Sequence, residues 1–180
     1  MTLAPAARNP AISRELVHRL AEACSDEGEA FQPTALRLVQ EQRRLSRYIE
    51  QNVQHLGAMP SQVALHMLTV SMRVFEQVGG RMGKVSTADI DRAAARIQAV
   101  ADQVLPADSG LPERVRAIDW RAQPHLLDEV LWALYERDAD ARKEGEVDLG
   151  QDQSALVFLV MWLAIEALDS VWRAPKGFAG

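Results

Sequence analysis

The stretch ALVFLVMWLAI, residues 155–165, is the longest uninterrupted apolar run in the chain, and Glu166 ends it. A membrane-spanning helix needs about 20 apolar residues, so this run predicts a helix buried in a protein core. A second apolar segment lies at 61–78, where polar residues recur every three or four positions and form one stripe about 100° wide. Both segments are typical of helices that neighbouring helices cover on most of their circumference.

The composition is that of one ordinary globular domain. The chain has 180 residues, of which 48% are hydrophobic and 25% charged, and a chain of this size buries roughly 70% of its unfolded surface. Its formal net charge of −5 argues against a general nucleic-acid-coating role, because phosphate binding needs an excess of Lys and Arg. Cys24 is the only cysteine, which excludes an intramolecular disulfide and a Cys-rich zinc site.

The other helices are predicted from apolar residues at helical spacing and from the prolines and glycines that begin and end helices. Strand signals are nearly absent. The main helices are expected at 10–26, 33–56, 61–78, 86–105, 124–136 and 152–173, with a short helix at 112–120.

The expected fold is all-α: a single compact bundle of six main helices and one short helix, with 61–78 and 152–173 central. Residues 1–9 are expected to form a disordered lead, 10–173 a single helical domain and 174–180 a flexible tail. The start of the chain lacks the apolar core of roughly 7–15 residues that a secretory signal needs. Together with a reduced thiol this favours the cytoplasm, and the preference for Arg over Lys is typical of a bacterial chain.

A glycine-rich stretch, GGRMGKVS, occupies residues 79–86. A phosphate-binding loop would need Gly at Val78, Ser or Thr at Val85, and a preceding strand. A weaker prediction remains, because the N–H groups at the start of the helix that follows favour an anion. The alternative is an ordinary capped loop between helices. The anion-binding candidates are Arg81, Gly83 and Lys84.

Three polar groups on the two central helices are candidates for ligand binding. His66 and Arg73 belong to the polar stripe of 61–78, and Glu166 follows the long apolar run. If another helix covers the stripe, these groups line a pocket in which Arg73 meets an acidic ligand; otherwise the stripe faces water. Glu166 is either a buried general acid with a raised pKa or the point where a polar face leaves the core.

The helix expected at 33–56 has an apolar seam that two polar residues interrupt. Such interruptions occur in helical interfaces, where a polar residue fixes the register at a cost in stability. The alternative is that the seam is simply part of the bundle core. The interface candidates are Leu38, Gln42, Leu45, Ile49 and Asn52.

Four arginines lie on the same expected helix without forming a continuous stripe. Arg43 and Arg47 share one face, and Arg37 and Arg44 share another. A helix-turn-helix unit consists of a short helix, a tight turn and a recognition helix, and the long helix expected at 33–56 does not fit it, so DNA binding is only a third hypothesis.

Catalytic and metal chemistry lack a complete set of groups in the sequence. Glu15 and His18 have the E-x-x-H spacing of helical di-iron sites, but a second such motif is missing. His125 shares a helix face with Asp128 and Glu129, without the further ligands that a closed metal site needs. No catalytic residue, metal ligand or cofactor is therefore predicted.

The sequence favours a cytoplasmic helical protein that acts by binding a protein partner or a second copy of itself. An alternative is a small-molecule-binding or enzymatic bundle with a polar pocket between the helices at 61–78 and 152–173. The third hypothesis is a helical transcriptional regulator. Membrane and nucleic-acid partners are not expected, whereas a small-molecule ligand is compatible with the alternative.

Overall fold

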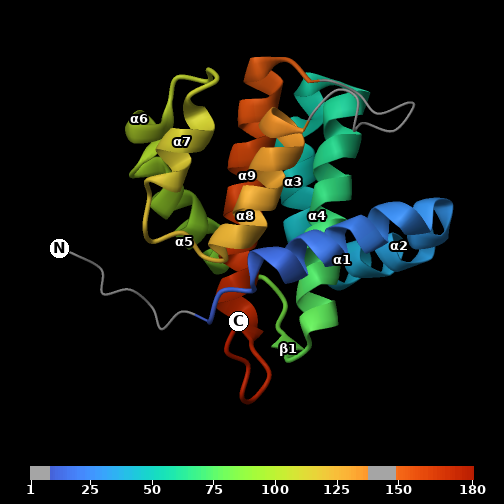
Figure 1. Cartoon of the computed structure of the whole chain (residues 1–180). Helices are drawn as coiled ribbons and strands as arrows, with labels where there is room; N and C mark the ends of the chain where they lie inside the picture. The colour runs from blue at the N-terminus through green and yellow to red at the C-terminus, as the bar shows by residue number, and fades with distance from the viewer. Residues whose placement is uncertain (1–8, 138–148) are drawn as a thin grey trace.

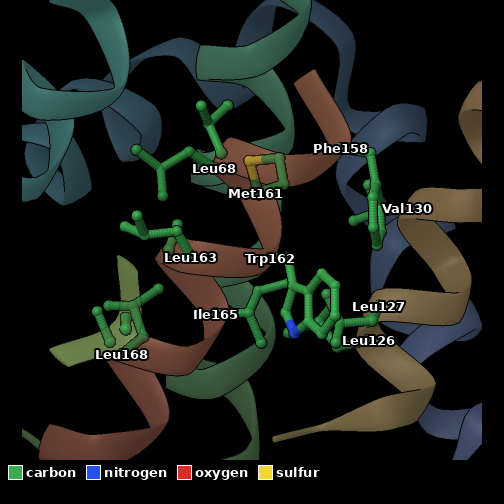
Figure 2. Close-up of a cluster of buried hydrophobic side chains, with 14 of the residues drawn as sticks. Leu68, Leu126, Leu127, Val130, Phe158, Met161, Trp162, Leu163, Ile165 and Leu168 are labelled. Carbon is green, nitrogen blue, oxygen red and sulfur yellow. The ribbon is translucent and has the colours of Figure 1, made fainter. Parts of the chain in front are cut away.

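The computed structural model describes residues 9–137 and 149–180 and has the expected all-α fold (Figure 1). Two long helices, α4 (Ala58–Val78) and α9 (Gln151–Val171), pack against each other at its centre. Figure 2 shows Phe158 of α9 beside Val130 and Trp162 beside Leu127, both in the helix Pro124–Leu131. Met161 of α9 lies near Leu68 of α4. These three α9 side chains and Leu68 are fully buried, so α9 forms the axis of the core.

Shorter helices cover the two central ones. The helices that pack on α4 are α1 (Arg14–Glu27), α2 (Gln32–Glu41) and α3 (Arg43–Val53). Those that pack on α9 include α5 (Thr87–Gln98) and α8 (Pro124–Leu131), and α8 also contacts α1. The short helices α6 (Ala101–Val104) and α7 (Leu111–Arg116) pack on each other. Single turns of 3-10 helix lie at Gly28–Phe31 and Gln54–Leu56, and a π-helical turn at Trp132–Glu136 extends α8.

The helix expected at 33–56 is two helices, because the chain breaks at Gln42. Its φ of −111° and ψ of 47° lie outside the helical region. The side chain is only 6% exposed and uses both ends of its amide. Nε2 donates to the Gly83 carbonyl at 2.7 Å, and Oε1 accepts from the Val85 N–H at 3.0 Å. This contact with a distant loop overrides a locally continuous helical pattern. The helix expected at 86–105 is likewise divided, near Val100.

A two-residue antiparallel ladder joins the loop after α4 to the end of α9. β1 (Arg81–Met82) pairs with β2 (Trp172–Arg173), and Arg81 lies opposite Arg173. The sequence placed the first segment in a loop and the second in a helix. The ladder lies at one end of the molecule and leaves the core helical (Figure 1).

Residues 174–180, expected to be a flexible tail, pack against the body. The ring of Phe178 meets Trp172 at 6.0 Å in an edge-to-face contact, so the tail touches the end of the core at this residue. At the other end, residues 1–8 of the expected disordered lead lie outside the described residues. Asn9 is held in place, since its Nδ2 donates to the carbonyls of Asp169 and Trp172, each at 2.9 Å.

α9 is also long and apolar enough to cross a membrane, since its most apolar window has a mean hydropathy of 1.8. In this fold, 78% of that window is buried inside the protein. Core helices pass the same test of length and composition, so this feature is weak evidence for a membrane span. The burial agrees with the core helix expected from the sequence.

Candidate functional site

The three groups predicted to line a pocket between α4 and α9 lie apart. His66 is exposed, and its ring packs 6.4 Å from that of Phe31. Arg73 donates to Glu76 at 2.6 Å, one turn further along the same helix. Glu166 is buried against α5, and neither His66 nor Arg73 contacts it there. The predicted pocket is therefore not formed by these residues, because apolar side chains fill the contact between α4 and α9.

Glu166 does prove to be a buried carboxyl. Its Oε1 accepts from the Ala122 N–H at 2.7 Å, and its Oε2 lies 3.1 Å from Nη1 of Arg96 at ion-pair distance. Burial raises the pKa of Glu166, against the opposing effects of that N–H and of Arg96. The Arg96 guanidinium also lies 4.6 Å above the ring of Trp120. These contacts tie α5 and the segment before α8 to α9, which is a structural role.

Two histidine-containing clusters of the sequence are rearranged in space. His18 Nδ1 lies 3.1 Å from Oε1 of Glu129, 111 residues away, and Arg14 contacts the same carboxylate. The edge of the His18 ring meets Trp132 at 5.4 Å. Within residues 9–137 and 149–180, no group of three or more His, Cys, Asp or Glu side chains is placed to hold a metal ion.

The seam predicted as an interface lies inside the molecule. Leu38, Leu45 and Ile49 are buried in the common core, where α3 packs on α4 and α9. Asn52 is half-buried, and its Nδ2 donates to the Tyr48 carbonyl at 2.8 Å. The seam is thus mainly part of the bundle core, which was the alternative interpretation.

The anion site predicted at the start of α5 is already filled by the chain. Asp89 accepts from the Ser86 N–H at 2.8 Å and from the Ser86 hydroxyl at 2.7 Å, while Ser86 Oγ accepts from the Asp89 N–H. This capping box places a carboxylate where a bound anion would sit. The Gly83 N–H donates to the Val171 carbonyl at 2.9 Å. Of the predicted anion ligands, Arg81 lies in β1, and only Lys84 borders an open site.

That open site is a groove between the α2–α3 junction, α3 and the start of α5, with a volume of about 1130 Å³. We call it the cationic groove. It unites two groups of basic residues that are separate in the sequence. Its polar lining includes Gln40, Gln51, Ser86, Thr87 and the carboxylates of Glu41 and Asp91, with Tyr48 on its wall. Its four cations are Arg43, Arg44, Arg47 and Lys84.

The cations of the groove are not neutralised by neighbouring carboxylates. Within the described part of the chain, Arg43, Arg47 and Lys84 have no carboxylate at ion-pair distance, and all three are exposed. Arg44 Nη1 donates to the Thr87 hydroxyl at 3.3 Å. The carboxylate of Glu41 already pairs with Arg37, outside the groove, at 2.9 Å. A chain of net charge −5 therefore carries a local excess of positive charge.

Gln42 holds the two sides of the groove together. Its hydrogen bonds are to Gly83 and Val85, the residues on either side of Lys84 in the chain. They hold the loop that carries Lys84 against Gln42, which directly precedes Arg43. This role of Gln42 was not predicted from the sequence, in which Gln42 is a candidate interface residue. The sequence does contain a signal for this role, because Gln42 is a polar residue inside an apolar seam and directly precedes Arg43 and Arg44.

Comparison with protein families, with curated proteins and with solved structures finds no match to this chain. Its function is therefore inferred from the geometry of the groove.

Proposed function

We propose that the chain is a helical binding protein whose cationic groove holds an acidic segment of a partner protein. The observation that carries the proposal is the convergence of four exposed cations from two segments of an acidic chain on one open groove. Arginine binds carboxylates through paired N–H donors, and several cations acting together accelerate the encounter with an acidic partner.

The groove suits a protein segment better than a nucleic acid. The carboxylate of Asp91 on its wall opposes a continuous row of phosphates, and the net charge of −5 repels a long polyanion. The amides of Gln40 and Gln51 and the hydroxyl of Thr87 provide donors and acceptors that match a peptide backbone. An acidic segment with a few carboxylates can place them opposite the arginines and avoid Asp91.

The test is calorimetric titration of the full chain with a synthetic peptide rich in Asp and Glu. The charge-reversal variant Arg43→Glu/Arg47→Glu should bind the peptide at least about tenfold more weakly, and the wild-type affinity should fall as salt is added. The control variant Arg19→Glu/Lys176→Glu makes the same change in net charge at exposed residues outside the groove, and it should retain the wild-type affinity.

Two outcomes contradict the proposal. If duplex DNA binds at the same ionic strength more tightly than the peptide, the regulator hypothesis takes its place. If the peptide does not bind, or if both double variants weaken it equally, the groove is not a binding site for an acidic segment.

A further inference from the structure

A narrow apolar cleft of about 150 Å³ adjoins the cationic groove. Glu41 and Gln42 line both the cleft and the groove, so the two openings lie next to each other at the α2–α3 junction. We call this second opening the apolar cleft. Its apolar walls come from α2, α4, β1 and β2, and they are Leu38, Met72, Phe75, Met82 and Trp172.

Contacts within the protein hold two wall residues of the apolar cleft in place. The ring of Phe75 meets Trp172 at 5.0 Å, and the Trp172 indole N–H donates to the Gly79 carbonyl at 3.0 Å. An apolar cavity of about 150 Å³ stays dry and accepts a benzene-sized molecule. The volume of the cleft is therefore sufficient for one apolar side chain such as leucine.

The mouth of the apolar cleft does not repel an acidic ligand, although Glu41 and Glu76 lie there. Arg37 pairs with both carboxylates, at 2.9 Å and 2.8 Å, and Arg73 adds a second contact to Glu76. These pairs neutralise the mouth, and the hydrogen bond from Arg37 lowers the pKa of Glu76.

We propose that the partner's acidic segment carries an apolar residue that enters the apolar cleft while its carboxylates lie along the cationic groove. This inference rests on the proposed function and adds the chemistry of the partner to it. The opposite charges of the segment and the cationic groove accelerate their association. The buried apolar side chain increases the affinity and fixes the position of the segment along the groove. A segment with acidic residues alone would leave the apolar cleft empty.

The inference is tested with two synthetic peptides that are identical in their acidic residues, one with a central leucine and the other with serine at that position. Burial of a leucine side chain should make the first peptide bind roughly tenfold more tightly, or more. In Met82→Phe, where a larger side chain occupies the cleft, the two peptides should bind equally. The control Met59→Phe changes an exposed methionine outside both openings and should keep the full difference.

The indole N–H resonance of Trp172, assigned by its loss in Trp172→Phe, locates the leucine. The leucine peptide should shift this resonance in the wild type, and the serine peptide should not. Equal affinities of the two peptides for the wild type would overturn the proposal that the apolar cleft binds a side chain, and would not affect the proposal for the cationic groove. A leucine advantage that survives in Met82→Phe, or an unshifted Trp172 resonance, would overturn the proposal for the apolar cleft as well. If neither peptide binds, the proposed function fails and this inference fails with it.

Discussion

The α4–α9 contact and the cationic groove are built in opposite ways. The contact is a dense set of apolar side chains, such as Met161 against Leu68, that are buried whatever the details of the surrounding loops. The groove consists of exposed charged side chains that are brought together by one buried amide, that of Gln42. Apolar periodicity thus determines the core, whereas the candidate functional surface depends on a few polar contacts between segments about 40 residues apart, chiefly the two hydrogen bonds of Gln42.

The core should be the more fragile of the two regions. Trp162 is fully buried between Trp120, stacked at 5.5 Å, and Phe158 at 5.9 Å. Trp162→Ala should lower the free energy of unfolding by about 3–5 kcal/mol, measured by denaturant titration, because it leaves a large cavity. Leu105→Ala, at an exposed position, should change it by less than about 0.5 kcal/mol. A loss below about 1 kcal/mol for Trp162→Ala would mean that α9 is not the axis of the core.

Gln42 should have an intermediate effect on stability and a large one on the groove. Gln42→Ala leaves the Gly83 carbonyl and the Val85 N–H without their partner, which should cost about 1–3 kcal/mol of unfolding free energy. The Val85 amide should then exchange with solvent faster, and the acidic peptide should bind more weakly. Gln51→Ala, which removes an exposed amide from the same groove, is the control. An unchanged exchange rate at Val85 would show that Gln42 does not hold the loop.

Glu166 should make the stability of the core depend on pH. Because burial raises its pKa in the folded state above the ordinary 4.5, the folded protein binds the proton more tightly than the unfolded chain does. The stability associated with the protonated form is therefore fully present below pH 4.5 and is lost as the pH rises through the raised pKa.

The comparison is with Glu166→Gln, which can still accept from the Ala122 N–H but has no charge. Across that pH range the wild type should lose stability relative to the variant, by about 1.4 kcal/mol for each unit by which the pKa is raised. Denaturant unfolding at a series of pH values measures the difference. If the wild type instead gains on the variant as the pH rises, the pairing with Arg96 outweighs burial.

The all-α fold and its two central helices could be predicted from the sequence, because both follow from the local pattern of apolar residues, whereas the same pattern left open whether Glu166 is buried. The break at Gln42 could not be predicted, since the helical period continues through it and the cause lies in a distant loop. The groove depends on that break. Likewise, the sequence grouped Glu129 with His125, whereas the fold pairs it with His18, which is 111 residues away.

The most direct test of the binding site is to map the amide chemical shifts of the full chain during titration with the acidic serine peptide. If the cationic groove is the site, the shifts should concentrate at residues 43–47 and 84–87, on both sides of the groove. Shifts centred on the predicted but dispersed pocket residues His66 and Arg73, with residues 43–47 and 84–87 unchanged, would contradict the account.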